Sequence, residues 1–204
     1  MRTSSMFQPS VEQIDALVRE HPLGLLVSSS PQGMMATPLP LLLDRSGDSV
    51  SLLGHFARSN PQVDAVRSNP EALVVFMGPE SYISPSWFTD RAQAPTWNFA
   101  TVHFSVRVEL HDDLREAENA VERLTTSLEA NRTAAWRTDE LGERYGRLIP
   151  HIVPFRAAVH SVRAKFKLGQ NERPDVLAEA IRGATESGCV KLAEMMQSVN
   201  AGRL

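Results

Sequence analysis

The 204-residue sequence predicts a mainly β fold with added helices, of the α+β class, in the form of a small β-barrel decorated by helices. Five or six segments of strand length are separated by turns rich in Gly, Pro, Asn, Asp and Ser, a pattern typical of barrels and sandwiches. The longest segment, 96–110, alternates in the two-residue period of a half-buried strand. Segments with helical spacing lie between and after the strands, so we expect helices that cross or cover the barrel.

The predicted strands are apolar or alternating segments bounded by turn residues. In chain order they cover residues 23–28, 34–44, 50–56, 72–77, 96–110 and 149–163. The second strand contains Pro38 and Pro40, which point to one side because strand residues alternate. Since proline cannot donate to a β ladder, we expect this strand to be an edge, bulged or ligand-facing. The segment DRSGD at 44–48 is the predicted hairpin turn that follows it.

The predicted helices combine apolar residues at helical spacing with recognisable ends. They cover residues 10–20, 61–68, 112–131, 134–148, 174–186 and 189–199. Ser10 and Gln13 match a capping box, and Asn60-Pro61 is a favoured start for the second helix. Residues 78–95 form a long segment rich in aromatic and hydroxyl side chains, which is typical of a functional loop rather than of a disordered one.

Composition and charge exclude several classes of protein. A hydrophobic fraction of 42% is ample for a core, and a net charge of −3 provides no overall attraction to nucleic acid or anionic membranes. The single cysteine, Cys189, excludes an intrachain disulfide framework and a zinc cluster built on cysteines within one chain. No apolar stretch approaches the roughly 18 residues of a membrane span, and the first ten residues lack the apolar core of a signal peptide. We therefore expect a soluble, cytoplasmic protein.

The first candidate site is the corner GHFARSNPQ at 54–62, where the third strand leads into the second helix. A helix N-terminus there would present N–H groups and the positive end of the helix dipole beside Arg58, Ser59 and Asn60. This combination suits a phosphate group. The alternative is an ordinary capped helix with a solvated arginine, because Asn-Pro caps begin many helices that bind no ligand.

Other motifs for chemistry are weak or absent. The six histidines show no metal-ligand spacing, and the sequence contains no Gly-x-Ser-x-Gly elbow, Walker A motif or dinucleotide fingerprint. His55 and His103 lie in strand-like segments and could meet in space, although a satisfied core histidine is the commoner outcome. The basic run 163–173 either reaches a phosphate or an acidic partner, or is a solvated loop. The second helix of the C-terminal pair carries one basic residue, so we do not expect it to read DNA.

Four motifs occur in an order that resembles a known family: GHFARSNPQ, GPESYISPSWF, APTWNFATVH and KFKLGQN. With PLPLLLD near the N-terminus and LAEMM near the C-terminus, they resemble the PaiB-type family of FMN-binding split-barrel proteins, described as negative transcriptional regulators. The broader superfamily is similar to the pyridoxamine-phosphate-oxidase-like flavin barrels. The resemblance implies a six-stranded FMN-binding split β-barrel with peripheral helices and a C-terminal helical appendage.

The expected organisation is a split-barrel domain at 1–168, with inserted helices at about 112–148, and a helix pair at 169–204 packed on the same domain. FMN lies at a dimer interface in such barrels, so the resemblance implies FMN as the cofactor and a homodimer with FMN at the subunit interface. Prolines on a ligand-facing strand and a long aromatic loop also favour burial of these features against a partner.

The resemblance assigns cofactor-binding roles to residues at matching positions. They are His55, Ala57, Arg58, Ser59, Asn60, Thr37, Trp97, Asn98, His103, Lys165, Lys167, Gln170 and Asn171. The strand that lines the flavin, here Thr37-Pro38-Leu39-Pro40, lacks the arginine and lysine of the oxidases, which argues against ordinary oxidase chemistry. Gly169 stands where the family motif usually has serine, a mild change. We expect no dedicated catalytic residue and no metal site, so the flavin would carry any reaction.

Three functions remain open. The first is an FMN-binding homodimeric regulator, and the second is an FMN-dependent oxidoreductase or flavin reductase that acts on a small molecule. The third is a haem-binding split barrel with His55 or His103 as the iron ligand. Reduction of the flavin by NAD(P)H would support the second, and a Soret band would support the third. Direct DNA binding rests on the family description alone.

Overall fold

The structure is a computed structural model that describes residues 4–47 and 49–204. The predicted turn at 44–48 therefore lies partly outside the described residues, as do the first three residues of the chain. The strands are β1 (Leu23–Ser30), β2 (Gly33–Pro40), β3 (Leu42–Ser46), β4 (Ser49–Ala57), β5 (Glu71–Ile83), β6 (Thr96–Leu110) and β7 (Ile152–Lys167). The helices are α1 (Val11–Glu20), α2 (Gln62–Ser68), α3 (Leu114–Glu129), α4 (Glu143–Leu148), α5 (Pro174–Glu186) and α6 (Val190–Val199), with short 3₁₀ turns at Ser5–Phe7, Pro85–Trp87, Thr138–Leu141 and Ile149–His151.

The mainly β prediction is confirmed, but the described chain forms seven strands rather than six. They make one sheet in the order β2-β1-β5-β6-β7-β4-β3, so the hydrogen-bonded order of the described residues ends at β2 and β3 and does not close. β1 pairs antiparallel with β2 and β5, and β4 pairs antiparallel with β3 and β7. β2 is thus an edge strand, as its two prolines predicted.

The additional strand arises because the predicted strand 34–44 divides at Leu41. The segment before Leu41 pairs with β1, and the segment after it pairs with β4. At the division the Leu41 amide donates to the carbonyl of Pro22 at 2.8 Å instead of joining either ladder. The Leu41 side chain is buried, which gives this turn of the chain a place in the core.

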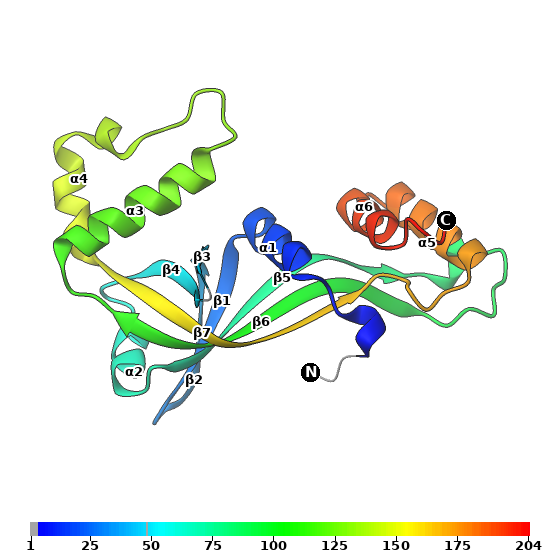
Figure 1. Cartoon of the computed structure of the whole chain (residues 1–204), viewed down its shortest axis with the longest axis horizontal. Coiled ribbons are helices and arrows are strands. Elements are labelled where there is room, and N and C mark those ends of the chain that lie inside the picture. The colour runs from blue at the N-terminus through cyan, green and yellow to red at the C-terminus, as the bar shows by residue number, and fades with distance from the viewer. Residues whose placement is uncertain (1–3, 48) are drawn as a thin grey trace. The chain divides into compact units, whose positions relative to one another are not determined.

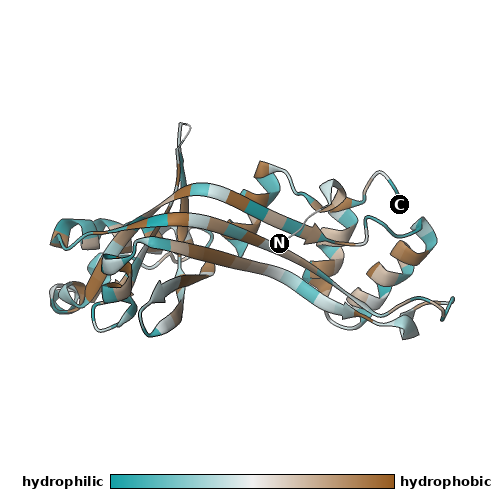
Figure 2. Ribbon diagram, turned by 90° about the horizontal axis from the view of Figure 1, so that it is seen from below, coloured by the Kyte–Doolittle hydropathy of each residue, from teal (hydrophilic) through white to brown (hydrophobic). Residues whose placement is uncertain are grey.

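The chain divides into two compact units. The larger unit comprises Asp15–Phe76 and His103–Val162, and the smaller unit comprises Met1–Ile14, Met77–Val102 and Arg163–Leu204. Figure 1 shows α2, α3 and α4 beside the strands of the larger unit, and α5 and α6 in the smaller unit. Figure 2 shows polar and apolar residues alternating along the long strands, as predicted for 96–110.

The interior of the larger unit is closed by the Leu41 side chain between two strands that carry glycine. A Cβ on Gly24 of β1 would lie 3.0 Å from Leu41 Cδ1, and a Cβ on Gly54 of β4 would lie 2.4 Å from Leu41 Cδ2. Phe76 and Phe155 also border these two positions. Both glycines are therefore required by close packing of backbone against side chain, not by their backbone angles.

The helix predicted at 134–148 is wrong as a continuous element. The structure has a 3₁₀ turn at Thr138–Leu141 and then α4, and the two meet at Gly142. Gly142 has a φ of 53°, in the left-handed region that interrupts an α-helix. The helix predicted at 112–131 is confirmed as α3, and the side chain of Asp113 caps it by accepting from the Arg115 amide at 2.8 Å.

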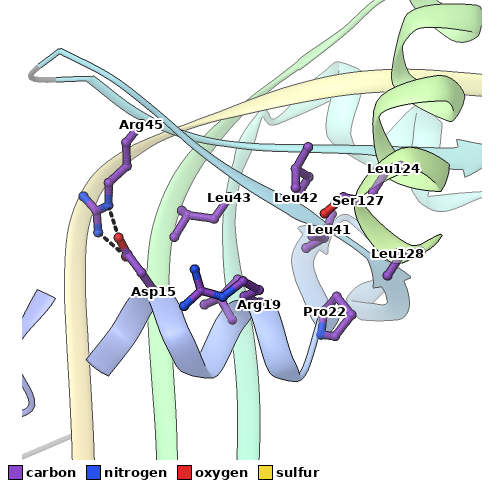
Figure 3. Close-up of a pocket in the computed structure, with 11 residues that line it drawn as sticks. Asp15, Arg19, Pro22, Leu41, Leu42, Leu43, Arg45, Leu124, Ser127 and Leu128 are labelled. Carbon is purple, nitrogen blue, oxygen red and sulfur yellow. Dashed lines mark hydrogen bonds and ion pairs between the residues drawn. The ribbon is translucent and has the colours of Figure 1, made fainter. Parts of the chain in front are cut away.

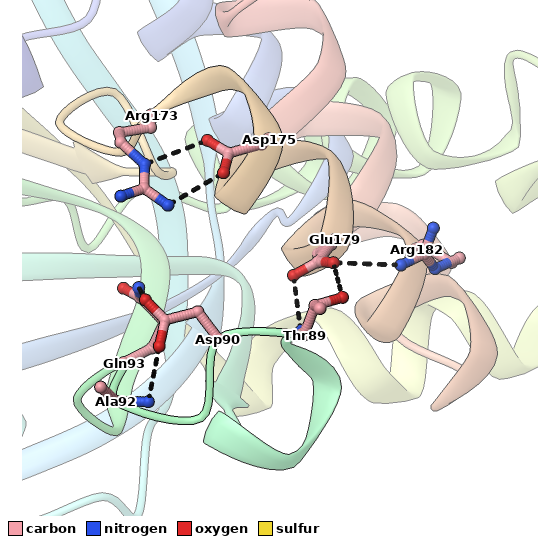
Figure 4. A network of polar contacts seen from close by, with 8 residues as sticks. All are labelled: Thr89, Asp90, Ala92, Gln93, Arg173, Asp175, Glu179 and Arg182. Carbon is pink, nitrogen blue, oxygen red and sulfur yellow. Dashed lines mark hydrogen bonds and ion pairs between the residues drawn. The ribbon is translucent and has the colours of Figure 1, made fainter.

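In the smaller unit, the predicted functional loop at 78–95 is held against α5. β5 continues to Ile83, and a 3₁₀ turn then presents Trp87 to the helix. A Cβ on Gly183 of α5 would lie 2.4 Å from Trp87 Cδ2, so this glycine lets the indole rest on the helix backbone. Thr89 donates its amide and its hydroxyl to the two oxygens of Glu179 (Figure 4). These contacts give the segment a structural role.

Gly54→Ala is expected to lower the free energy of unfolding by about 1–3 kcal/mol, the usual cost of overpacking a core. The added methyl group would lie 2.4 Å from Leu41 Cδ2 and 2.9 Å from Phe155 Cζ, so at least one of these buried side chains would have to shift. Urea denaturation followed by circular dichroism measures the change.

Gly146→Ala is the matched control, because a Cβ there has no neighbour within 4 Å and the residue lies inside α4. This variant should be about 1 kcal/mol more stable than the parent, since alanine favours the helix. Equal effects at the two positions would contradict the packing explanation for Gly54.

Candidate functional site

The arginine of the predicted phosphate corner is used to join three parts of the chain. Arg58 donates through Nε to the carbonyl of Pro150 at 2.9 Å and through Nη2 to the carbonyl of Ile152 at 3.0 Å. Its Nη1 donates to Asp112, which also accepts from Arg67. These two hydrogen-bonding arginines, Arg67 first and then Arg58, hold the pKa of the Asp112 carboxyl below its usual range. The guanidinium thus fixes the corner to the start of β7.

The amides at the start of α2 are also occupied. Arg58 donates its backbone N–H to His151, and Asn60 donates its own to Ala57. The Asn60 side chain accepts from the Gln62 amide at 2.9 Å, so the predicted cap is formed. Ser59 is exposed, and its hydroxyl makes no hydrogen bond within the described residues. Of the predicted corner, Ser59 keeps a polar group available for a ligand.

A buried amide connects Thr37 to this corner. The Gln62 side chain is fully buried; its Oε1 accepts from the Thr37 hydroxyl, and its Nε2 donates to Leu26 and to Ser28. Asn60 donates to the same Thr37 hydroxyl at 3.0 Å. A buried polar group is tolerated only when its hydrogen bonds are made, so this network ties α2 to β1 and β2. Gln62 was missed by sequence reasoning because its partners lie 25 to 36 positions earlier in the chain.

His55 contains a polar atom that lacks a partner. It lies on β4 opposite Pro154 of β7, and its Nδ1 is buried without a hydrogen bond to the described residues. Burial lowers the pKa of His55 from its usual value of 6.5, because the charged form loses its hydration. The side chain is therefore neutral at pH 7. His103 lies half-buried on β6 of the same unit.

Two lysines of the smaller unit are the cations best suited to an anionic ligand. The predicted basic loop begins inside β7, so Lys165 and Lys167 are alternate strand residues on one side. Lys165 Nζ lies 5.5 Å from the ring centre of Phe7 and 5.8 Å from that of Phe99, and Lys167 donates to the Thr96 hydroxyl. Among the described residues neither ammonium group forms an ion pair at 4 Å or less.

Burial and the neighbouring charge of Lys165 lower the pKa of Lys167, and the attraction of Glu172 only partly opposes them. A pair of cations held together without a carboxylate contact is destabilised by mutual repulsion, which an anion would relieve. This donor set fits the phosphate of a nucleotide. Trp97 is exposed, lies on β6 and contacts Tyr82 with ring centres 6.1 Å apart, so an apolar aromatic surface is present in the same unit.

Three other predicted residues of the smaller unit have mainly structural contacts. Asn98 is buried, and its Nδ2 lies 3.6 Å from the sulfur of Met196 on α6. Gln170 closes the turn after β7 by donating to the Phe166 carbonyl and accepting from the Leu168 amide. Asn171 donates to its neighbour Glu172.

The glycine at 169 is more constrained than a mild change from serine would imply. Its φ is 84°, and a Cβ there would lie 2.8 Å from Leu177 Cδ1. A serine would meet both the left-handed backbone and the packed leucine. The backbone angle and the packing at position 169 therefore both favour glycine over serine.

No group of three or more potential metal ligands of the His, Cys, Asp or Glu type occurs in the part of the chain that the structure describes. Within the same residues no helix is both long and apolar enough to cross a membrane. Each unit thus has its own candidate group: Ser59 with its corner in the larger unit, and the lysine pair with Trp97 in the smaller unit.

The buried His55 should make stability depend on pH. The pKa of His55 is lowered in the folded state, so below about pH 6.5 the unfolded chain binds a proton at this residue more readily than the folded chain does. The free energy of unfolding therefore falls as the pH falls. His55→Asn should reduce that slope, by at most about 1.4 kcal/mol per pH unit for one proton. Urea denaturation at several pH values between 5 and 8 measures it. An unchanged slope in His55→Asn would contradict this assignment.

Comparison with known proteins identifies the family. The family model described as "Putative FMN-binding domain" matches residues 1–161. Protease synthase and sporulation protein PAI 2 of Bacillus subtilis (strain 168) is 29% identical over 197 residues, 92% of each chain. Uncharacterized protein YKL070W of Saccharomyces cerevisiae is 31% identical over 119 residues, 55% of this chain and 70% of that protein.

Solved structures share the fold at low sequence identity. A flavocytochrome of Azotobacter vinelandii has a TM-score of 0.62 at 16% identity, covering 80% of this chain and 70% of that one. An FAD and haem binding protein of Mycobacterium smegmatis has a TM-score of 0.60 at 17% identity, covering 81% and 75%. A conserved hypothetical protein of Mycobacterium tuberculosis has a TM-score of 0.58 at 14% identity, covering 82% and 91%. These similarities support a mainly β, split-barrel-like architecture, and the family match, which spans most of the chain, shows that this protein belongs to the FMN-binding domain family, with FMN as its cofactor.

Proposed function

We propose that the protein is an FMN-binding homodimer that acts as a negative regulator of transcription. The observation that carries the FMN part is the pair Lys165 and Lys167, which forms no ion pair among the described residues, in a chain of an FMN-binding family. The regulatory part follows the resemblance to the PaiB-type family, and the name of the Bacillus subtilis relative connects that protein with protease synthesis and sporulation.

In this proposal Lys165 and Lys167 bind the FMN phosphate, and Trp97 offers aromatic surface for the flavin ring. The other residues assigned to the cofactor are Thr37, His55, Ala57, Arg58, Ser59, Asn60, Asn98, His103, Gln170 and Asn171. Several of them act indirectly, since Arg58, Asn60 and Gln170 are engaged in the contacts described above. Bound FMN would supply redox chemistry, while the chain supplies charge compensation and an apolar surface.

Replacing the lysines by methionine tests the phosphate assignment. Lys167→Met should weaken FMN binding by roughly tenfold or more, the usual loss for a charge-assisted hydrogen bond, and Lys165→Met should act in the same direction. Quenching of flavin fluorescence during titration measures the dissociation constant. Lys191→Met is the control in the same unit, because Lys191 is already paired with Glu194 at 3.1 Å. Unchanged affinity in both β7 variants would rule out this phosphate site.

The dimer is supported by an exposed apolar face on the larger unit. The face is formed by alternate residues of three adjacent strands: Leu23, Leu25 and Val27 of β1, Met34, Ala36, Pro38 and Pro40 of β2, and Leu73 and Val75 of β5. Leu23 is 63% exposed and Met34 71% exposed. Contiguous exposed apolar residues on a soluble chain mark interaction surfaces, and edge strand β2 borders this one. We call it the β1–β2 face and propose that a second copy of the chain covers it.

If the β1–β2 face is the dimer interface, a charged residue introduced into it should dissociate the dimer. Leu25→Glu places a carboxylate at the centre of the face and should convert a dimer to a monomer in sedimentation velocity at micromolar concentration, because an unpaired charge is costly to bury. Val162→Glu, at an exposed apolar residue of β7 that is not part of the face, should leave the dimer intact. A parent protein that sediments as a monomer would refute the dimer directly.

The two alternative functions are separated by different measurements. Reduction of bound FMN by NAD(P)H would favour an oxidoreductase or flavin reductase. Haem binding is favoured by one observation, the neutral and partly buried His55, and requires a Soret band that His55→Ala removes. A gel shift with promoter DNA and its dependence on salt would address direct DNA binding.

A further inference from the structure

The larger unit contains a cavity that shares no residue with the proposed FMN site. It has a volume of about 290 Å³ and is bordered by α1, β3 and α3 (Figure 3). Its apolar lining comes from Val18 and Pro22 near α1, from Leu41, Leu42 and Leu43, and from Leu124 and Leu128 of α3. Its polar lining consists of Asp15, Arg19, Arg45 and Ser127. Cavities of this size, mostly apolar with a few polar groups, are typical of small-molecule sites.

Of the charged residues at the cavity, Asp15 and Arg45 pair with each other, and Arg19 is left without an ion-pair partner among the described residues. Arg45 donates to both oxygens of Asp15, at 2.6 Å through Nη2 and at 2.7 Å through Nε, so the Asp15 carboxylate is satisfied. Arg19 follows Asp15 by one turn of α1, and Figure 3 shows its guanidinium rising from the helix beside the apolar side chains. Across the residues that the structure describes, the Arg19 side chain forms no hydrogen bond or ion pair. The cavity therefore presents one uncompensated positive charge.

We propose that this cavity binds a small monocarboxylate with an apolar body. The carboxylate would pair with Arg19, since guanidinium and carboxylate match in geometry and charge, and the apolar body would lie among Leu42, Leu43 and Leu124. A second carboxylate would find no further cation available in the cavity, because Arg45 is held by Asp15. We choose octanoate as the test ligand, because it combines one carboxylate with an unbranched apolar body and is small enough for a cavity of about 290 Å³.

Arg19 also lies in the last turn of α1, where any cation favours the helix dipole. A stability measurement would therefore not separate a ligand-binding role from a structural one. The preference for a charged over a neutral ligand of the same shape does separate them, because the helix dipole contributes nothing to that preference.

The experiment compares octanoate with octanamide by ¹H–¹⁵N chemical-shift mapping of the full chain, at concentrations where octanoate is monomeric. Octanoate should shift amides of α1, β3 and the C-terminal half of α3 and should bind roughly tenfold more tightly than octanamide. Arg19→Met should lose this preference, whereas Arg144→Met, at an exposed arginine of α4 outside the cavity, should keep it. Ser127→Trp should fill the cavity from an exposed position on α3 and abolish binding of both ligands.

Three results would overturn the proposal. They are the absence of saturable shifts with octanoate, shifts confined to the β1–β2 face or to the smaller unit, and an unchanged octanoate preference in Arg19→Met. Circular dichroism of each variant confirms folding, and the preference of the unmodified protein needs no variant. FMN binding is measured separately, so failure here leaves the proposed function untouched.

Discussion

The larger unit depends on the close approach of Leu41 to two strands that carry no side chain at the contact. Gly24 and Gly54 admit the leucine from opposite sides, and its burial draws the chain out of the β1 ladder and into the β4 ladder. The position of Leu41 thus marks the boundary between β2, which pairs with β1, and β3, which pairs with β4. It also sets the start of β3, whose leucines line the cavity beside α1 and α3. Core packing and the second proposed binding site therefore share a single cause.

Polar groups of the corner in the larger unit are hydrogen-bonded within the protein, whereas the lysine pair of the smaller unit is available to a ligand. In the corner of the larger unit, Arg58 donates to carbonyls at the start of β7, and Asn60 and Gln62 bond to each other and to Thr37, so the corner has few donors left. In the smaller unit, Lys165 faces aromatic rings and Lys167 a hydroxyl, and neither contacts a carboxylate of the described residues. The internal hydrogen bonds of the corner hold its residues in position. The two lysines, which lack an ion-pair partner among the described residues, favour an anionic ligand.

Local patterns were sufficient to predict some of this fold. The alternation of 96–110 and the spacing of α1, α3, α5 and α6 depend on residues close in sequence, and these elements are observed where they were expected. The division at Leu41 has no local signal, because it follows from contacts with Gly54 and Phe155 farther along the chain. The same holds for Arg58: the sequence shows a guanidinium beside a helix start, but its acceptors lie 92 and 94 positions away. Motifs in the sequence were enough to propose residues for the site. They could not show which of these side chains are already engaged by distant parts of the chain and which can bind a ligand.

The lowered pKa of Lys167 suggests how ligand binding and stability would be connected. Burial and the charge of Lys165 make the lysine pair a local source of free energy that opposes folding of the smaller unit. An anion bound between the ammonium groups would offset this cost, and a ligand that binds only the folded state stabilises it further by mass action. Because both lysines lie on β7, the stabilisation would be transmitted to that strand and to its turn at Gly169, which is packed against Leu177 of α5. Binding of an anion at this pair is therefore expected to stabilise the folded form of the smaller unit.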